Sequence, residues 1–495
     1  MSCPPKEPCR VESQKRAAFG IGWRGDTPPL KGCCAVTFGF NYDALSRRTQ
    51  LTRPNGVNTN YNYDSVSHLL SVLHQAGSTT LDGASYNYDS AGNRTSKTNY
   101  LNGITSNYGY DAIYELQQVT QGSGTTESYS YDAVGNRLSS LGMSPYSYNT
   151  SNELTATASG SYTYDSNGNT LTDASGKSYT WDFENQMVSA VVPGTGTVAF
   201  KYDPFGRRIY KSSPNFTGIF VYDGDNLIES MNSAGTVLAH YTQTQNVDEP
   251  LAALNSGGSS YYDADGLISI TSLTSSTGAV ANTYTYDSFG NVTNFNGTLS
   301  NPFQYTGREP DSETGLYYYR ARYYDSAIGR LVSEDPIGFS SGSGHFYRYV
   351  DNSPIGYIDP FGLTCTCVYH QSSGSIRCTD DATGKVVVTA TGYSGIGAGL
   401  NDPTMQGTGD PGPVWGPIPQ GWWDISPHAT TTKGPYTIRL TPAPGTNTFG
   451  RTDIEIHGDN QAVNHTGSHG CIVVPKRQDR RRIADCGGGR LEVLP

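Results

Sequence analysis

Residues 86–94 read Tyr-Asn-Tyr-Asp-Ser-Ala-Gly-Asn-Arg, and residues 129–137 return to the same pattern as Tyr-Ser-Tyr-Asp-Ala-Val-Gly-Asn-Arg. Alternating aromatic residues present one face of a β-strand, and the Asp-x-x-Gly-Asn stretch supplies a turn with a left-handed position for Gly. An aliphatic residue soon after the turn, such as Leu138, Leu171 or Ile209, begins a return strand. Each unit is therefore predicted to be a β-hairpin.

The same pattern recurs about a dozen times between residues 40 and 292, at short and similar intervals. Clear copies also begin at Tyr162, Phe200 and Tyr284, and weaker copies begin near Phe40, Tyr61, Tyr108, Tyr146, Tyr179 and Phe220. One hairpin of this length cannot bury its own apolar face, so the units must stack in a continuous sheet. The predicted fold class is mostly β, with a strip of hairpins that forms a partial shell and a small β-rich domain after it.

The composition of the 495 residues agrees with many short strands and tight turns, because 58 are Gly, 36 are Tyr and only 16% are charged. It excludes a coiled coil and a collagen-like chain, which need charged heptads and a Gly at every third position. No apolar run approaches the roughly 20 residues that cross a bilayer, so no membrane span is expected. The opening MSCPPKEPCR is polar and precedes no apolar segment, so no cleavable signal peptide is expected.

Charge is unevenly distributed along the chain. Residues 364–495 hold 11 of the 33 Lys+Arg and 11 of the 44 Asp+Glu, so the net charge of −11 falls on residues 1–363. An acidic chain repels phosphate backbones, and nucleic acid is therefore not expected as a partner. The basic run at Lys476-Arg477 and Arg480–Arg482 is predicted to be a solvated turn, with contact to an anionic polymer as the alternative.

Residues 364–495 are predicted to form a separate domain, large enough for its own core. Alternating polar and apolar residues predict strands in this part of the chain at residues 386–390, 436–440, 453–457, 471–474 and 491–494. The chain has nine cysteines, and an odd number leaves at least one thiol outside any set of intrachain disulfides. Cys378 and Cys486 are a possible pair, which the sequence does not establish.

One constellation in this domain suggests nucleophilic chemistry: His457-Gly458-Asp459, followed by Ser468-His469-Gly470-Cys471. A cysteine nucleophile reacts as the thiolate, and a nearby imidazole lowers the pKa of the thiol. Cys471 begins an apolar strand, where an adjoining loop is expected to expose the sulfur, and its N–H is placed to help form an oxyanion hole. From the spacing alone, a buried structural cysteine is an equally good interpretation.

The hairpin pattern over residues 38–363 resembles the YD repeats of Rhs proteins, teneurins and the toxin-complex C subunits. That resemblance implies a β-strip wound into a hollow cocoon that encloses the C-terminal segment, although a dozen repeats is fewer than such shells commonly have. Residues 303–363 resemble the Rhs-associated core, with Gly315-Leu-Tyr-Tyr-Tyr-Arg-Ala-Arg-Tyr-Tyr-Asp325 and the closing Asp359-Pro-Phe-Gly-Leu363.

Members of that family cleave themselves after the closing Asp-Pro-x-Gly-Leu motif, which implies cleavage of the Leu363–Thr364 bond here. Asp335 and Asp359 are the implied pair of carboxyl groups, one activating water and the other protonating the leaving group. Arg322 matches the auxiliary arginine of the family. The alternative is that both Asp-Pro pairs are ordinary turns.

The C-terminal domain resembles the L,D-transpeptidase-like (YkuD-like) antibacterial effectors of type VI secretion, through His-Gly-x, Ser-x-Gly-Cys and the stretch around Gly450-Arg451. The resemblance implies Cys471 as nucleophile and His457 as base. It implies further residues that line the site or shape its oxyanion hole: Gly458, Asp459, Ser468, Gly470 and Arg451. The implied substrate is the peptidoglycan stem peptide, hydrolysed or subjected to D-amino acid exchange, and no metal or organic cofactor is expected.

Four segments are therefore predicted: an unassigned segment 1–37, the repeat shell 38–302, the core 303–363 and the toxin domain 364–495. The hypothesis is a secreted Rhs-type antibacterial effector that acts in the periplasm of a target bacterium. Expected partners are a cognate immunity protein and a secretion spike, chaperone or adaptor. The alternatives are a structural or adhesive surface protein with an inactive last domain, and a housekeeping L,D-transpeptidase that builds cross-links.

Overall fold

The computed structural model describes residues 14–15, 37–45, 47–65, 67–244, 246–336, 345–362, 365–380, 386–395, 400–405, 416–430, 437–442, 446–449, 454–458, 471–476, 479–480, 483 and 490–495. Almost all regular structure in these ranges is β-strand, which confirms the predicted fold class. The same ranges contain the short 3₁₀ helices η1 (Tyr305–Gly307), η3 (Val350–Asn352) and η5 (Pro403–Met405). No helix in the described part of the chain is long and apolar enough to cross a membrane.

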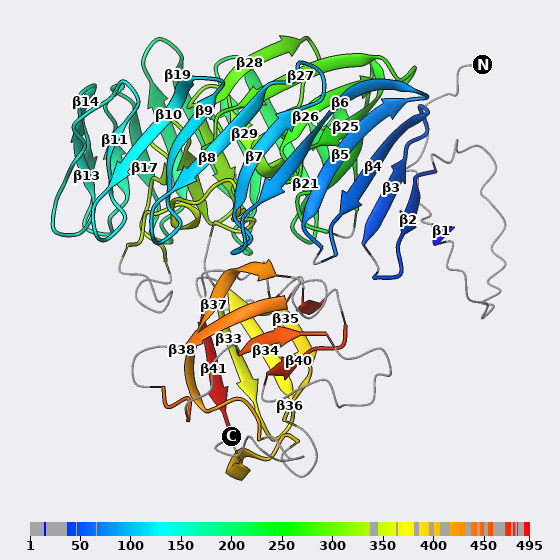
Figure 1. Cartoon of the computed structure of the whole chain (residues 1–495). Coiled ribbons are helices and arrows are strands. Elements are labelled where there is room, and N and C mark those ends of the chain that lie inside the picture. The colour runs from blue at the N-terminus through cyan, green and yellow to red at the C-terminus, as the bar shows by residue number, and fades with distance from the viewer. Residues whose placement is uncertain are drawn as a thin grey trace.

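The first wall of the shell is a meander in which each strand pairs with the next along the chain (Figure 1). Its antiparallel strands are β2 (Gly39–Tyr42), β3 (Arg48–Thr52), β4 (Val57–Tyr63), β5 (Leu69–Ala76), β6 (Thr79–Tyr88), β7 (Arg94–Asn99), β8 (Thr105–Tyr110), β9 (Leu116–Gln121), β10 (Gly124–Tyr131) and β11 (Arg137–Ser140). β1 (Gln14–Lys15) joins this sheet in parallel with β2. A short sheet follows with β12 (Ser147–Tyr148), β13 (Leu154–Thr157) and β14 (Gly160–Ser161).

The second wall is a longer meander of the same kind. Its strands are β15 (Thr163–Tyr164), β16 (Thr170–Thr172), β17 (Ser178–Trp181), β18 (Met187–Val192), β19 (Gly196–Tyr202), β20 (Arg208–Ser213), β21 (Phe216–Asp223), β22 (Asn226–Met231), β23 (Val237–Gln243), β24 (Pro250–Asn255), β25 (Gly258–Ala264), β26 (Ile270–Ser275), β27 (Val280–Tyr286) and β28 (Val292–Gly297). The return strands predicted at Leu138, Leu171 and Ile209 are β11, β16 and β20, as expected.

The turn predicted from the repeat is present between β6 and β7. The Asp89 carboxylate accepts hydrogen bonds from the backbone N–H groups of Ala91 and Asn93, both at 2.9 Å. Gly92 has φ of +90°, a conformation that is strained for a residue with a Cβ. The side chain of the repeat Asp therefore replaces backbone partners in the turn, and Gly provides the conformation that the turn requires.

The second Tyr of each repeat has a role beyond packing. The Tyr88 hydroxyl donates a hydrogen bond to the carbonyl oxygen of Leu69 (2.9 Å), the first residue of strand β5. The same bond, always to the first residue of an earlier return strand, is made by Tyr110, Tyr131, Tyr202, Tyr222 and Tyr286. Each repeat is thus joined to an earlier one through a hydroxyl group, which explains why this position is Tyr rather than Phe.

The two walls pack directly against each other. The ring of Phe38 contacts that of Tyr261 at a centroid distance of 6.0 Å, and buried Arg53 pairs with buried Asp263 at 3.1 Å. Lys97 on β7 pairs with Asp265 beyond β25 at 2.9 Å. Side chains therefore fill the space between these strands. The enclosure of the C-terminal segment implied by the family resemblance is not found, because the sheet of residues 365–494 lies outside and below the walls in Figure 1.

Residues 303–362 pack as a Tyr-rich core between the walls. Four strands form its sheet: β29 (Glu309–Asp311), β30 (Leu316–Tyr319), β31 (Arg322–Asp325) and β32 (Arg330–Leu331). Tyr319, Tyr324 and Tyr349 are buried in one cluster with Leu116 of the first wall and Phe289, which follows β27 of the second. Burial of aromatic side chains from three separate parts of the chain stabilises the joined walls.

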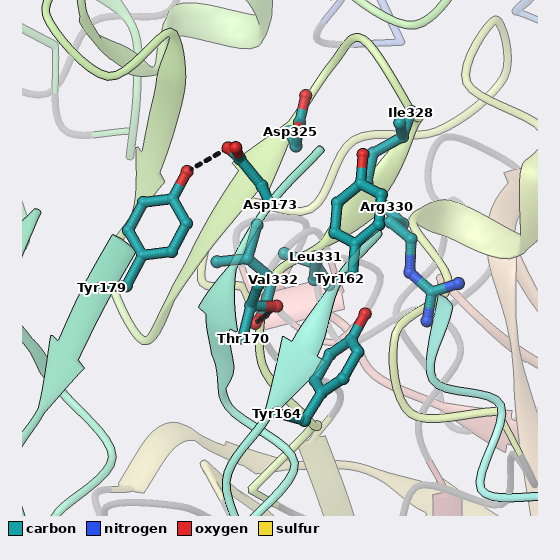
Figure 2. Close-up of a pocket in the computed structure, with 10 residues that line it drawn as sticks. All are labelled: Tyr162, Tyr164, Thr170, Asp173, Tyr179, Asp325, Ile328, Arg330, Leu331 and Val332. Atoms are coloured by element: carbon teal, nitrogen blue, oxygen red, sulfur yellow. Dashed lines mark hydrogen bonds between the residues drawn. The ribbon is translucent and has the colours of Figure 1, made fainter. Parts of the chain in front are cut away.

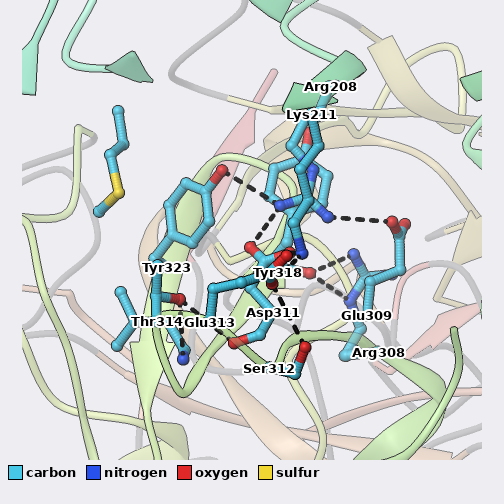
Figure 3. Close-up of polar contacts among 12 residues, drawn as sticks. Arg208, Lys211, Arg308, Glu309, Asp311, Ser312, Glu313, Thr314, Tyr318 and Tyr323 are labelled. Carbon is cyan, nitrogen blue, oxygen red and sulfur yellow. Dashed lines mark hydrogen bonds and ion pairs between the residues drawn. The ribbon is translucent and has the colours of Figure 1, made fainter. Parts of the chain in front are cut away.

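Buried ion pairs also connect the core to the second wall (Figure 3). The Arg208 guanidinium on β20 lies 2.5 Å from the Asp311 carboxylate on β29, and the Lys211 ammonium lies 2.9 Å from the other oxygen of Asp311. Burial raises the pKa of Asp311, but the two cations outweigh burial and leave that pKa below its usual value. Loss of one partner in such a buried pair leaves a charge uncompensated, which typically costs about 3–5 kcal/mol.

The C-terminal domain is a single sheet in the order β35-β34-β33-β41-β37-β38-β39-β40-β36, counted over the described residues. Its strands are β33 (Cys365–His370), β34 (Ser375–Asp380), β35 (Val386–Thr391), β36 (Tyr393–Ser394), β37 (Gly421–Thr430), β38 (Thr437–Pro442), β39 (Glu455–His457), β40 (Ile472–Val473) and β41 (Arg490–Leu494). All five predicted strands are present with small shifts at their ends. The sequence prediction missed β33, β34, β36 and β37.

A disulfide crosses the hairpin of β33 and β34. Cys367 and Cys378 occupy directly opposed positions and are bonded to each other, so Cys378 does not pair with Cys486. Both cysteines are fully buried in the domain core with Trp423 and Ile438. The Cα atoms of the two residues are 3.8 Å apart, well inside the roughly 7 Å beyond which two cysteines cannot be bridged.

Replacing Cys367 and Cys378 together by Ala is expected to lower the unfolding free energy of this domain by about 3 kcal/mol. The bond closes a loop across a sequence separation of 11, and its removal restores that chain entropy to the unfolded state. Hydrogen exchange of peptides from β33 to β41 in the full chain would measure the loss. Peptides from β15 to β28 serve as the internal control, and equal losses in both regions would contradict the prediction.

Candidate active sites

The structure brings together the three residues predicted for self-cleavage. Arg322 begins β31, Asp335 follows β32, and Asp359 lies near the end of the core. One guanidinium nitrogen of Arg322, Nη2, lies 3.1 Å from the Asp335 carboxylate and 3.9 Å from that of Asp359. Both carboxyl groups therefore face the same cation, although they are well separated in the sequence.

Backbone groups hold this arrangement in position. The Asp335 N–H donates a hydrogen bond to the carbonyl oxygen of Phe346 (2.9 Å), and Arg322 Nη1 donates to the same oxygen at 2.9 Å. Arg322 and Asp335 are almost fully buried. The site is thus preorganised by the fold of the core rather than by contacts within a single turn.

Gly362, just before the predicted cleavage point, is held by hydrogen bonds at both its N–H and its carbonyl group. The Gly362 N–H donates to the Asp359 carboxylate at 2.8 Å, and Arg322 Nε donates to the Gly362 carbonyl oxygen. Gly362 has φ of +67°, and a Cβ there would collide with the carbonyl oxygen of Tyr319. Only glycine fits at this position. Leu363 and Thr364, the predicted cleavage residues, lie outside the described residues.

The chemistry available to this site is acid–base catalysis of amide hydrolysis. Both carboxyl groups lie within 4 Å of one guanidinium nitrogen, at 3.1 and 3.9 Å, which is close enough for one to act as general base and the other as general acid on the same bond. The Arg322 guanidinium lies near both carboxyl groups and also binds the Gly362 carbonyl, so it places the two groups relative to the preceding peptide. The site is adjacent in sequence to the bond that the family resemblance marks for cleavage.

The second candidate site lies in the C-terminal sheet. His457 is on β39 opposite Val473 of the parallel strand β40, and Cys471 immediately precedes β40. Because side chains alternate along a strand, Cys471 and Val473 share the face of the sheet on which His457 lies. The structure therefore places the predicted nucleophile and base on neighbouring strands, one diagonal step apart.

His457 is oriented by its own backbone. Nδ1 lies 2.7 Å from the carbonyl oxygen of Gly458, which favours the tautomer with the proton on Nδ1 and the lone pair on Nε2. Cys471 is 4% exposed and His457 is 2% exposed, so the expectation that a loop would expose the thiol is wrong for this structure. A structural cysteine shows the same burial, and the catalytic role of Cys471 stays a prediction.

Arg480 is a residue beside this site that the sequence analysis misassigned. It belongs to the basic run predicted to be solvated, yet it is only 5% exposed. Its guanidinium donates to the carbonyl oxygens of Val474 and Pro475, just after β40, and lies against Gly458, where an added Cβ would be 3.1 Å away. Arg480 thus joins the segment after Cys471 to the residue after His457. Of the other predicted site residues, Asp459, Ser468, Gly470 and Arg451 lie outside the described residues.

A separate small pocket lies between the second wall and the core (Figure 2). It has a volume of only about 10 Å³ for the centre of a water molecule, which is room for about one water. Its lining residues are Tyr162, Tyr164, Thr170, Asp173, Tyr179, Asp325, Ile328, Arg330, Leu331 and Val332. Burial raises the pKa of Asp325. Burial also acts on Asp173, but hydrogen bonds from Ser175 and Tyr179 hold the pKa of Asp173 below its usual value. No residue predicted from the sequence to be catalytic lines this pocket, and within the described ranges no three His, Cys, Asp or Glu side chains form a metal site.

Comparison with known proteins supplies independent information. The family model of the teneurin YD-shell matches residues 99–355. The chain is 32% identical to the tRNA nuclease WapA of Bacillus subtilis over 309 residues, which cover 61% of this chain and 12% of WapA. It is 30% identical to the double-stranded DNA deaminase toxin A of Burkholderia cenocepacia over 203 residues, covering 35% of this chain and 14% of that toxin.

A solved structure of TcdB2-TccC3 shares the fold, with a TM-score of 0.56 and 20% identity, and the match covers 66% of this chain and 20% of that one. The chain thus spans only a small part of the length of each relative.

These relatives contradict the expectation that nucleic acid is not a partner. WapA and the deaminase toxin are named for action on tRNA and on DNA. The expectation rested on the net charge of −11 carried by residues 1–363, but the charge of a shell does not determine the substrate of a domain attached to it. Residues 364–495 have no net charge and give no electrostatic argument in either direction.

Proposed function

Because the chain belongs to the teneurin YD-shell family and is similar to Rhs and WapA toxins, we propose that it is a self-cleaving toxin of this type. Cleavage between Leu363 and Thr364 separates the shell from residues 364–495. The observation that carries the proposal is the meeting of Arg322, Asp335 and Asp359 at the carbonyl and N–H of Gly362.

The reaction is hydrolysis of one peptide bond. One carboxylate of the pair takes a proton from water, and the oxygen attacks the carbonyl carbon of Leu363. The bond from that carbon to the Thr364 nitrogen breaks, and the protonated carboxyl group delivers its proton to the departing amine. Arg322 keeps the ionised carboxylate charged and holds the carbonyl of the preceding residue in place.

The released domain is proposed to be a cysteine enzyme that acts on peptidoglycan stem peptides. The Cys471 thiol loses its proton to His457, and the sulfur attacks the carbonyl carbon of the third stem residue. A thioester forms, the bond to the terminal D-alanine breaks, and His457 returns the proton to the leaving amine. Water or a free D-amino acid then attacks the thioester and restores the thiol. Support comes from the neighbouring strands of Cys471 and His457 and from the Nδ1 contact with Gly458.

Delivery and protection follow from this proposal. A toxin that attacks the wall needs access to the periplasm of a target bacterium, and its producer needs an immunity protein there. Export through a secretion spike, with a chaperone or adaptor, is part of the same proposal.

A second candidate function is action on nucleic acid by residues 364–495. The observation that favours it is the naming of WapA for tRNA and of the deaminase toxin for double-stranded DNA. In this alternative the shell and its cleavage site keep the same role, and the C-terminal domain carries a different activity.

The test is a parallel substrate assay of the full chain, after mass spectrometry has established whether it is cut. Tetrapeptide muropeptides, total tRNA and double-stranded DNA are incubated with wild type and with the C471S variant. Conversion of tetrapeptides to tripeptides, or exchange of D-alanine, by wild type alone supports the cysteine enzyme. Breakdown of tRNA or deamination of DNA by both proteins supports the second candidate. An uncut chain without activity on any substrate favours a structural or adhesive surface protein.

A further inference from the structure

The peptide before the cleavage point is held by a second arginine, Arg320, which the sequence analysis did not single out. Arg320 Nη1 donates a hydrogen bond to the carbonyl oxygen of Pro360, and its guanidinium carbon lies 5.5 Å from the centre of the Phe361 ring. The neighbouring Ala321 N–H donates to the Phe361 carbonyl oxygen at 3.2 Å. The segment that ends at Gly362 is therefore bound by Arg320 and Ala321 as well as by Arg322.

Arg320 is itself anchored on the second wall. Both of its terminal nitrogens donate to the Asp248 carboxylate, at 2.7 and 3.0 Å, in a bidentate ion pair. Nη2 also donates to the carbonyl oxygen of Asp225, in the turn between β21 and β22, at 2.9 Å. A bidentate pair fixes the plane of the guanidinium as well as its position. The cleavage peptide is thus attached to the wall through one rigid side chain.

Asp248, the anchor of Arg320, is itself fixed by hydrogen bonds to other residues. Its backbone N–H donates to the Asn226 side chain at 3.2 Å, and its carboxylate also accepts from Arg308 of the core. Asp248 is 4% exposed, so this pairing takes place away from water, where a charged hydrogen bond is strong. Gly307 of η1 lies against the Asp248 carbonyl, where an added Cβ would collide with the oxygen.

We propose that Arg320, anchored by Asp248, is a positioning residue for self-cleavage: it holds residues 360–362 so that the following bond meets the carboxyl pair. The proposal rests on the self-cleavage proposed above. In this role Arg320 acts on the reaction through the peptide it holds. The cleavage machinery is therefore completed by the wall, and only a chain whose second wall has folded around the core places the bond correctly.

The test compares the rate of self-cleavage in chains synthesised in a cell-free system, pulse-labelled and followed over time on gels. Arg320→Gln is expected to slow cleavage about 30-fold, since a peptide displaced by a fraction of an ångström meets the carboxyl pair poorly. Asp248→Asn is expected to slow it in the same direction, because Arg320 loses its anchor. Arg320→Lys keeps the positive charge but lacks the planar guanidinium that forms two hydrogen bonds at once, and it is expected to recover part of the cleavage rate.

Arg208→Gln is the control, because Arg208 also links the second wall to the core through carboxylate partners, and these are Asp311 and Glu309 rather than residues 360–362. It is expected to cleave at the wild-type rate at a temperature where every variant remains folded. The pH dependence of the cleavage rate gives a further readout. Arg320→Gln is expected to lower the rate at every pH without shifting the pH values at which the rate rises and falls, whereas Arg322→Lys is expected to shift those pH values.

Each outcome decides the question. Wild-type rates for Arg320→Gln, with a wild-type chain that cuts itself, would overturn the positioning role and leave the proposed self-cleavage intact. Equal slowing of Arg320→Gln and Arg208→Gln, with equal loss of thermal stability, would also overturn it, because the effect would then be general instability. A wild-type chain that never cuts itself would instead remove the proposed function on which the inference rests.

Discussion

Asn at either Asp335 or Asp359 is expected to leave the protein as a single uncut chain, whereas wild type yields two fragments, one ending at Leu363 and the other beginning at Thr364. Asn keeps the size of the side chain but neither accepts a proton from water nor delivers one to the leaving amine. General acid and general base catalysis each contribute about 10²–10⁴-fold, so the rate should fall by about that factor in each single variant. Intact mass spectrometry of the purified chain measures the result and locates the new terminus.

The matched control for this pair is Asp351→Asn. Asp351 lies in the same segment of the core, but it is partly exposed and pairs with Arg348, at 2.6 Å, rather than with Arg322. Its variant should be cut like wild type. Cleavage that persists in both Asp335→Asn and Asp359→Asn would show that these carboxyl groups hold the core together without taking part in the reaction. Cleavage at a position other than Leu363–Thr364 would contradict the assignment of the bond.

The second large effect is expected at Cys471. Replacing it by Ser or Ala should lower the turnover of tetrapeptide muropeptides by about 10⁴-fold or more, because removal of a nucleophile eliminates the covalent pathway. Ser has nearly the same volume as Cys, so a loss of activity in Cys471→Ser does not come from a cavity in the core. Liquid chromatography with mass spectrometry of the muropeptides measures the products, and the thioester on Cys471 should be detectable in wild type after an acid quench.

His457→Gln should reduce the same activity about 10²–10⁴-fold, since the thiol then lacks a base. His370 on β33 is exposed and serves as the control, because His370→Gln removes an imidazole from the same domain without approaching the site. Full activity of Cys471→Ser would exclude the acyl-enzyme. Cys471 would then be a structural residue of the core, a role with which its burial also agrees. Loss of activity in His370→Gln would show that the assay reports stability rather than catalysis.

The repeat hairpins could be predicted from short stretches of sequence because their causes are local. Asp89 and Gly92 act within one turn, through hydrogen bonds to residues two and four positions away and through a backbone conformation that Gly alone adopts without strain. The strand that contains His457 and the strand that follows Cys471 were predictable for a similar reason, since alternation of polar and apolar residues is visible along a single segment. The missed strand β37 begins among prolines and glycines, where that alternation is absent.

Only part of the proposed cleavage site was predictable from the sequence. Arg322, Asp335 and Asp359 match family motifs that can be read along the chain. Arg320 stands in the same motif as Arg322, but its partner Asp248 is 72 residues away and no sequence pattern connects the two. The burial of Arg480 was equally invisible, because a basic run predicts solvation until the carbonyl groups of Val474 and Pro475 are seen beside the guanidinium.

Local turn chemistry and strand periodicity in the sequence thus established a mostly β chain of stacked hairpins. The packing of the two walls against each other, the pairing of Cys367 with Cys378 and the attachment of the cleavage peptide to Asp248 required the folded chain. The physical reason is that a turn or a strand depends on neighbours a few residues away. The disulfide depends on the register in which two neighbouring strands pair, and a buried ion pair depends on the positions that distant strands take once the core has closed around them.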